Sequence, residues 1–231
     1  MKEEIITLKD VWKTYRMGDV EVHALRGLNL SIKKGEFVSI QGPSGSGKST
    51  AMNMVGALDL PTKGKIYLDN KDISTMSESD LAQIRGKKIG FIFQQFNLIP
   101  TMSALENVAL PMMFQGASKE KREKRAKELL EMVELGERLD HKPYEMSGGQ
   151  QQRVAIARSL VNEPEVILAD EPTGNLDSKT SNIVMEFLKD LHKNKKTTII
   201  MVTHDPDTAK FAERVESLHD GQIIKTRRKK K

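Results

Sequence analysis

Four short apolar runs stand out in the pattern of hydrophobic and polar residues along the chain. They occupy residues 37–40 (FVSI), 89–93 (IGFIF), 166–169 (VILA) and 198–202 (TIIMV). Because these runs are short and rich in β-branched residues, the pattern predicts buried strands. Helical segments fit between or beside them at residues 49–58, 178–193 and 205–213, and Ser178 is the expected N-cap of the second. The alternation predicts an α/β fold built on a mainly parallel sheet flanked by helices.

The N-terminal part of the chain has a different pattern, in which polar and apolar residues alternate between turns. The alternating stretches are residues 5–11, 20–32 and 64–70. Alternation with a period of two is typical of strands in antiparallel sheets. We therefore expect a small antiparallel β subdomain beside the main sheet.

The segment between the second and third buried strands is helical in character. It contains ALENVALPMMF at residues 104–114, a charged helix at 119–135 and a further helix after residue 150. We expect residues 95–163 to form a helical subdomain inserted into a core of residues 1–94 and 164–231. Residues 1–231 then form one domain, which is within the size range of single α/β domains.

The composition narrows the class of protein. No apolar run reaches the roughly 18 residues of a membrane-spanning helix, and residues 1–10 lack the apolar stretch of a signal peptide, so we expect a cytoplasmic protein. The chain has no cysteine, which excludes disulfides, thiolate metal sites and cysteine nucleophiles. The net charge of +5 is concentrated in the basic tail, residues 225–231, and the rest of the chain is close to neutral. Terminal basic runs are usually solvated, and we do not expect nucleic acid as a partner.

Each predicted buried strand is followed directly by polar residues. In strand order these are Gln41 with a glycine-rich loop, Gln94, Asp170 with Glu171, and Thr203 with His204. The carboxyl ends of parallel strands lie on one edge of the sheet, and open α/β folds bind ligands at that edge. The sequence therefore predicts a ligand site there.

The glycine-rich loop, residues 42–50 (GPSGSGKST), matches the phosphate-binding pattern G-x-x-x-x-G-K-[ST]. It lies after a predicted strand and before a predicted helix, as that pattern requires. Its glycines allow backbone N–H groups to turn toward phosphate oxygens, while Lys48 reaches the β- and γ-phosphates and Ser49 coordinates Mg²⁺. The alternative, a glycine-rich surface turn, does not explain the flanking strand and helix.

The polar side chains at the other strand ends suit a nucleotide and its metal ion. Asp170 is placed to support Mg²⁺ and Glu171 to polarise an attacking water, although two acids after a strand also occur in ordinary loops. His204 is placed to contact the γ-phosphate, although a single histidine is often structural. Gln94 suits either Mg²⁺ or the attacking water.

The stretch MSGGQQQR at residues 146–153 raises the question of a second anion site. Ser147 and two glycines precede an apolar-periodic helix, and helix N-termini of this kind bind anions. The chain already has one phosphate loop, so one nucleotide does not explain both. Tyr15 is a candidate stacking surface for a purine ring, but its spacing alone favours core or surface packing.

Together these motifs resemble one family across nearly the whole chain, the nucleotide-binding subunits of ABC transporters. The motifs are GPSGSGKS at 42–49, the glutamine of FIFQQFNLIP at 91–100, the signature SGGQ at 147–150, VILADEP at 166–172, GNLD at 174–177 and VTHD at 202–205. One departure is Met146, where leucine is usual; it is an apolar residue of similar size.

The resemblance implies a role for each matching residue. In the family, an aromatic residue stacks on adenine, a carboxylate acts as general base, and a histidine senses the γ-phosphate. The implied catalytic residues are Lys48, Gln94, Glu171 and His204, and the implied metal ligands are Ser49, Gln94 and Asp170. The implied ATP-binding residues are Tyr15, Ser44, Gly45, Ser46, Gly47, Lys48, Ser49, Thr50, Ser147, Gly148, Gly149, Gln150 and Asp177.

The resemblance also implies partners. Two such subunits form a homodimer head to tail around two ATP molecules, so that the signature of one chain closes over the ATP held by the phosphate loop of the other. This dimer drives a separate integral membrane permease from the cytoplasmic face and does not touch the transported substrate. Two sequence stretches, QQFNLIPTMSALENVALP and ADEPTGNLDS, most resemble those of one branch of the family, the lipoprotein-release, macrolide-efflux and cell-division ATPases.

Other ATPases with related motifs remain alternatives. One is an ATPase of this type that acts on a non-transport membrane complex or on nucleic acid. Repair and chromosome-organising ATPases carry long coiled coils, however, and the predicted insertion has no sustained heptad pattern. Related translation factors carry two such domains, and small-molecule kinases do not need SGGQ.

Overall fold

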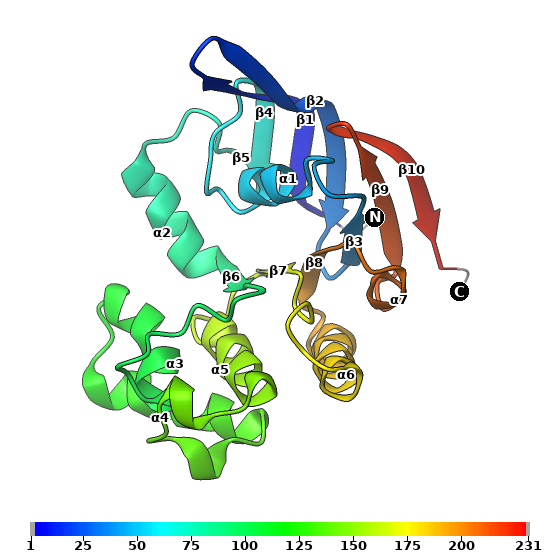
Figure 1. Ribbon diagram of the computed structural model, residues 1–231. Helices are drawn as coiled ribbons and strands as arrows, with labels where there is room; N and C mark the ends of the chain where they lie inside the picture. Colours follow the sequence, from blue (N-terminus) through cyan, green and yellow to red (C-terminus); the bar gives the residue numbers. More distant parts are fainter. Residues whose placement is uncertain (1–2, 230–231) are drawn as a thin grey trace. The chain divides into compact units, whose positions relative to one another are not determined.

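The computed structural model describes residues 3–229, so the last two residues of the basic tail, Lys230 and Lys231, lie outside the described residues. The chain divides into two units, and Figure 1 labels the helices and strands of both. The first comprises Met1–Arg85 and Lys189–Lys231, and the second comprises Gly86–Leu188. The boundaries fall within helices α2 (Glu78–Lys88) and α6 (Ser178–Lys195).

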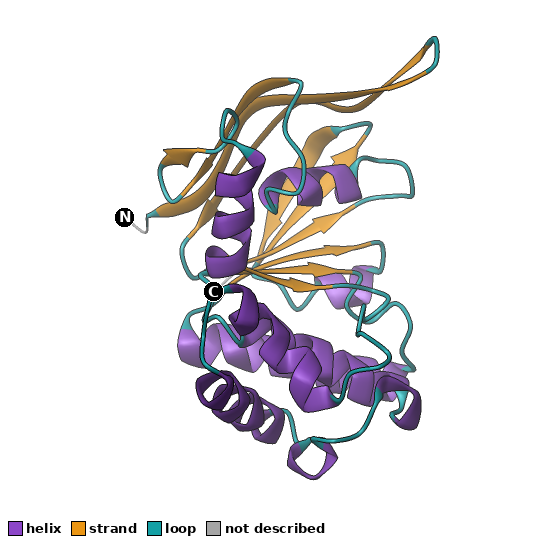
Figure 2. Cartoon of the chain, turned by 90° about the vertical axis from the view of Figure 1, so that its left-hand side faces the viewer, coloured by secondary structure: helices purple, strands orange, loops and turns teal. Residues whose placement is uncertain are grey.

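The first unit contains the predicted antiparallel sheet. Its strands have the order β2-β1-β4-β5 and are β1 (Glu4–Met17), β2 (Val20–Lys33), β4 (Lys63–Leu68) and β5 (Lys71–Asp72). Alternate residues in the second half of β2 are buried, as the period of two requires. Figure 2 shows the β1–β2 hairpin reaching beyond the other strands of this sheet.

The first unit also contains parallel strands that lead to the glycine loop. Strand β3 (Phe37–Gln41) pairs in parallel with β8 (Thr198–Thr203) on one side and with β9 (Arg214–His219) on the other. Strand β10 (Gln222–Arg228) closes this edge as an antiparallel neighbour of β9. Every residue of β8 is buried, which is typical of a parallel strand covered on both faces.

Two helices of the first unit follow these strands. Helix α1 (Lys48–Val55) follows β3 and packs against β1, β2 and β8. Helix α7 (Pro206–Ala209) follows β8 and packs against β3 and β8. The predicted helix at residues 205–213 is therefore too long. It ends early because the chain turns back to the sheet, where the N–H of Glu213 donates to the carbonyl of Phe37.

The second unit combines two strands with a group of helices. Strands β6 (Ile89–Ile92) and β7 (Val166–Asp170) pair in parallel. Helices α3 (Ala104–Phe114), α4 (Lys119–Met132) and α5 (Gly148–Leu160) pack against one another, and α5 also packs against β6. Short turns of 3₁₀ helix, η1 (Gly136–Arg138) and η2 (Pro143–Glu145), connect α4 to α5.

Helix α6 is capped by a different residue from the one that the sequence indicated. The helix starts at Ser178, but Asp177 is the capping residue. Its Oδ1 accepts hydrogen bonds from the backbone N–H groups of Lys179 and Thr180, both 3.0 Å away. The prediction of Ser178 as N-cap is therefore wrong by one residue, because the preceding carboxylate satisfies the first N–H groups of the helix.

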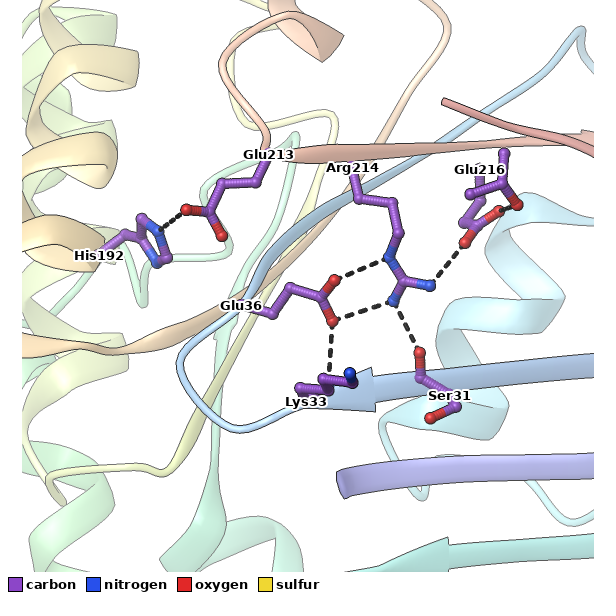
Figure 3. A network of polar contacts seen from close by, with 8 residues as sticks. Ser31, Lys33, Glu36, His192, Glu213, Arg214 and Glu216 are labelled. Atoms are coloured by element: carbon purple, nitrogen blue, oxygen red, sulfur yellow. Dashed lines mark hydrogen bonds and ion pairs between the residues drawn. The ribbon is translucent and has the colours of Figure 1, made fainter. Parts of the chain in front are cut away.

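A buried ion network joins β9 to the strands around it (Figure 3). The Arg214 guanidinium lies 2.9 Å from a carboxylate oxygen of Glu36 and 2.7 Å from one of Glu216. It also donates to the carbonyl of Ser31, and the hydroxyl of Thr226 donates to Glu216. Arg214 and Glu216 are both buried, so each charge depends on its partners for compensation.

Removal of Arg214 should therefore destabilise the first unit strongly. Replacing Arg214 by leucine leaves Glu216 buried without its cation, and we expect the free energy of unfolding to fall by about 3–5 kcal/mol. The control is Arg16→Ala, which breaks the exposed pair with Glu21 and should cost less than about 1 kcal/mol. Urea unfolding followed by circular dichroism measures both. Equal small losses in the two variants would show that the network contributes no more than a surface ion pair.

Candidate functional site

The glycine loop has a conformation that only glycines permit at several positions. Gly45 and Gly47 have φ angles of 77° and 96°, in the left-handed region. A side chain at Gly42 would place its Cβ 2.2 Å from the carbonyl oxygen of Leu218. The loop is thus held against β9 with its backbone in an unusual conformation, as a phosphate-binding loop requires.

The loop leads into the N-terminus of α1, which has no side-chain cap. Gly47 is the N-cap, no side chain accepts from the first N–H groups, and no acidic residue lies in the first turn. Lys48 is 8% exposed, and its ammonium donates to the carbonyl of Pro43 at 2.7 Å. Across residues 3–229, no carboxylate lies within ion-pair distance of Lys48. A buried cation beside uncapped N–H groups is suited to an anionic ligand.

His204 lies on the same edge of the sheet as the glycine loop. The register pairs Gln41 with Thr203, so the residues that follow β3 and β8 are neighbours. His204 is exposed, and Asp205 after it caps α7. Hydrogen bonds from the Thr208 hydroxyl and from backbone N–H groups hold the pKa of Asp205 below its usual value. The fold therefore fixes the backbone directly after His204 and leaves the imidazole accessible.

The second unit brings together another set of predicted residues at the ends of β6 and β7. The register pairs Ile92 with Ala169, so Gln94, just after β6, and Asp170, the last residue of β7, lie at neighbouring strand ends. Glu171 has a φ angle of 45°, which is strained for a residue with a side chain. The turn that follows is closed by a 3.0 Å hydrogen bond from the N–H of Gly174 to the carbonyl of Glu171.

This turn is also attached to the segment that carries Gln94. The side chain of Asn175 donates to the carbonyl of Gln94 at 2.9 Å. A Cβ at Gly174 would lie 2.7 Å from Nε2 of Gln94, so the glutamine side chain packs directly over that glycine. The position of Gln94 is thus coupled to the loop that carries Glu171.

The signature forms the first turn of α5 rather than a loop before it. Ser147 is the N-cap: its hydroxyl accepts from the N–H of Gln150, and the Gln150 side chain accepts from the N–H of Ser147. This capping box fixes both polar side chains. The N–H groups of Gly148 and Gly149 lie between them in the first turn, where a helix has no internal acceptor for them.

The second signature glycine is packed tightly against the start of α6. A Cβ at Gly149 would lie 2.4 Å from Cγ2 of Thr180. Thr180 cannot easily rotate away, because its hydroxyl donates to Asp177 at 2.6 Å. That bond also holds the pKa of Asp177 below its usual value. Gly148 is different, since the nearest atoms to its Cβ position, on Leu176 and Phe96, are 3.7 Å away.

Two residues of α5 that no motif indicated hold the site's loops in place. Gln152 is fully buried and donates its side-chain amide to the carbonyl of Pro172, next to Glu171. Arg158 donates to the carbonyls of Phe96 and Asn97, just after Gln94, and burial lowers the pKa of its guanidinium. Sequence patterns did not reveal them because polar residues in an amphipathic helix are normally expected on its exposed face.

The predicted site residues thus form two groups, one in each unit. The glycine loop, His204 and Tyr15 belong to the first unit. Gln94, Asp170, Glu171, Asp177 and the signature belong to the second. Neighbouring strand ends or helix termini bring together the residues of each group except Tyr15, which lies within β1 and pairs with Val22 of β2.

Comparison with known protein families identifies the family to which this chain belongs. The profile of a family described as "ABC transporter" matches residues 25–174, which include the glycine loop, the signature and the β7 carboxylates. The chain belongs to this family. It is an ABC transporter ATP-binding subunit, and the expected P-loop NTPase fold is confirmed.

Relatives of known name support the same assignment. The ABC transporter ATP-binding protein MJ0796 of Methanocaldococcus jannaschii is 56% identical over 223 residues, which are 95% of each chain. YvrO of Bacillus subtilis is 50% identical over 220 residues. The macrolide export ATP-binding/permease protein MacB of Brucella melitensis is 49% identical over 220 residues, but the match covers only 34% of MacB. The similarity confirms the predicted branch of the family.

A solved structure resembles the whole chain. The ATP-binding cassette MJ0796, in a dimeric post-hydrolysis state bound to ADP and phosphate, matches with a TM-score of 0.91 and 51% identity. The match covers 98% of this chain and 99% of that one. Between residues 3 and 229, this ABC subunit has no helix long and apolar enough to cross a membrane.

The different packing of the signature glycines predicts different responses to alanine. Gly148→Ala should change the free energy of unfolding by less than about 1 kcal/mol, because the added methyl meets only ordinary contacts. Gly149→Ala should destabilise the chain by about 1–3 kcal/mol, because the methyl displaces Thr180 from Asp177. Urea unfolding without nucleotide tests this contrast. Equal stabilities would show that the Thr180 contact is not a constraint.

Proposed function

We propose that this subunit hydrolyses ATP with the residues that its motifs indicate. The phosphate loop, Ser44 to Thr50, binds the phosphates, and Lys48 carries the compensating charge. Glu171 accepts the proton of the attacking water as it adds to the γ-phosphorus, and the bond to ADP breaks. Gln94 orients that water and His204 contacts the γ-phosphate. The strongest support is the buried cation of Lys48 beside an uncapped helix N-terminus.

Residues Ser49, Gln94 and Asp170 are proposed to hold Mg²⁺. All three offer oxygen ligands, which Mg²⁺ prefers, and the last two lie at the neighbouring ends of β6 and β7. When bound, the ion neutralises negative charge on the phosphate oxygens. The protein's part is to fix the ligands, and the coupling of Gln94 to the Glu171 loop through Gly174 serves this purpose.

The second anion site is proposed to serve the nucleotide of a partner subunit. Two chains pair head to tail, and Ser147, Gly148, Gly149 and Gln150 of each chain cover the ATP bound to the other, next to Asp177. The capping box supports this arrangement, because it leaves the two glycine N–H groups at the helix end. The dimeric MJ0796 structure, which is bound to ADP and phosphate, supports it as well.

We further propose that this dimer drives a separate membrane permease from the cytoplasmic face. In this arrangement residues 95–163 form a helical subdomain that moves relative to the ATP-binding core of residues 1–94 and 164–231. Within this subdomain, Arg158 fastens the segment after Gln94 to the signature helix, so that the two would move together. MacB, which combines ATP-binding and permease functions in its name, supports a permease partner.

The assignment of the general base is tested by Glu171→Gln. The amide keeps the shape of the side chain but cannot accept the proton, so ATP turnover should fall by about a hundredfold or more. ATP binding should persist, and ATP should then hold a stable dimer. Phosphate release and size-exclusion chromatography with ATP measure the two effects. Wild-type turnover in this variant would remove Glu171 from the proposed role.

The head-to-tail arrangement is tested with two variants that damage opposite halves of the site. Lys48→Ala disables the phosphate loop. Gly148→Asp disables the signature, because its carboxylate repels the γ-phosphate, while its Cβ meets only ordinary contacts within the chain. Each homodimer should be inactive. In a mixed dimer with sites between chains, the intact loop of one variant meets the intact signature of the other, which gives one whole site.

In the mixture, ATP-dependent association is measured as well as turnover. A dimer with only one whole site can associate without hydrolysing ATP if turnover requires both sites. Adding Glu171→Gln to both chains slows release, and a tag on one chain allows capture of heterodimers. The matched control is each variant mixed with itself. If the site lay within one chain, mixing would restore nothing, and a mixture without recovered turnover or ATP-dependent heterodimer would contradict the proposal.

A further inference from the structure

Tyr15 is held by two charged residues that belong to no motif. Its hydroxyl donates to Oδ2 of Asp59 at 3.0 Å. The other carboxylate oxygen of Asp59 lies 2.6 Å from the ammonium of Lys13. That ammonium also lies 5.0 Å from the centroid of the Tyr15 ring. The Lys13 cation therefore contacts the ring, and the Asp59 carboxylate contacts the hydroxyl.

The segment that carries Asp59 is itself fastened to β1. The N–H of Leu60 donates to Asp59, and the Lys13 ammonium donates to the carbonyl of Leu60 at 2.8 Å. Two residues further on, Thr62 exchanges hydrogen bonds with β1: its N–H donates to the carbonyl of Trp12, and its hydroxyl accepts from the N–H of Thr14. Residues 59–62 therefore form a brace along β1 at the position of Tyr15.

We propose that Asp59, with Lys13, is a positioning residue for nucleotide binding, which fixes the Tyr15 ring in the orientation that stacks on the base. This inference rests on the proposed adenine contact of Tyr15. Asp59 does not itself touch the nucleotide. Its effect on affinity passes through the Tyr15 hydroxyl, so it depends on that hydroxyl and on a ligand that has a base.

The physical need for such a brace follows from the exposure of Tyr15. The side chain is 36% exposed and lies on a hairpin strand, so packing does not fully enclose the ring. If the ring has to be ordered when the nucleotide binds, the loss of conformational entropy lowers the affinity for the nucleotide. A ring that is already held in place avoids this cost. The Lys13 cation also interacts favourably with the ring, which further restricts its position.

The charges around the hydroxyl keep this arrangement intact at neutral pH. Burial and the hydrogen bond to Asp59 raise the pKa of the Tyr15 hydroxyl, so it remains a donor. Burial alone would raise the pKa of the Asp59 carboxyl. Hydrogen bonds from Lys13 and Tyr15 outweigh this effect and hold that pKa below its usual value, so the carboxylate remains an acceptor. The Tyr15 hydroxyl and the Asp59 carboxylate therefore both stay in the protonation states that the hydrogen bond needs.

The test compares binding of ADP with binding of inorganic pyrophosphate, which has no base, by isothermal titration calorimetry. Asp59→Ala should weaken ADP binding about three- to tenfold and leave pyrophosphate binding unchanged. In a Tyr15→Phe background, which keeps the ring but lacks the hydroxyl, Asp59→Ala should have no further effect on ADP. Asp59→Asn, which still accepts from the hydroxyl, should recover part of the affinity.

Two comparisons separate this inference from the proposed function. The matched control is Asp72→Ala, which removes an aspartate of similar exposure that pairs with Lys65 in the same sheet, and it should leave both ligands unaffected. If Tyr15→Ala leaves ADP binding unchanged, the adenine contact itself is wrong. Two results would show that Asp59 is not a positioning residue for the base. One is that Tyr15→Ala weakens ADP binding but Asp59→Ala does not; the other is that Asp59→Ala weakens pyrophosphate binding as much as ADP binding.

Discussion

A helix begins with N–H groups that have no acceptor inside the helix, and the site of this protein depends on how two helices meet that constraint. At α1 the N-cap is a glycine in the left-handed region, and no side chain covers the first N–H groups. At α5 a capping box of Ser147 and Gln150 covers two N–H groups, those of Ser147 and Gln150, and leaves two glycines in the first turn. Lys48 is buried beside the first end, and among residues 3–229 it is the only buried lysine. The two helix ends therefore differ in how their first N–H groups are covered and are not duplicates of one another.

Close backbone packing is what holds both ends in place. Gly42 lies against the carbonyl of Leu218, so the phosphate loop takes its position from β9. Gly149 lies against Thr180, so the signature takes its position from the start of α6. Strand β9 depends in turn on the Arg214 network, which allows a strand with two inward-facing charges to pair with β3. The chemistry at the sheet edge thus rests on packing and on buried ion pairs behind it.

The sequence predicted the parts of the fold whose side chains follow the simple burial pattern. The apolar runs became β3, β6, β7 and β8 because these parallel strands are buried on both faces. Strand β9 escaped prediction for the opposite reason: Arg214 and Glu216 occupy its buried positions, and a charged residue in a buried position hides the period of two. The cap of α6 was misplaced because both Asp177 and Ser178 are good capping residues, and only the backbone geometry distinguishes them.

Motifs identify the residues that contact a ligand but not the residues that hold them. Tyr15 was a candidate from its aromatic ring, whereas Asp59 and Lys13 gave no sign in the sequence, because 44 residues separate Asp59 from the hydroxyl that it accepts from. The same is true of Gln152, which reaches the backbone beside Glu171 from the signature helix. Supporting residues of this kind are fixed by the tertiary structure alone, since their partners are backbone carbonyls or side chains that become neighbours only when the chain folds. A substitution far from any motif can therefore disturb a residue that a motif names.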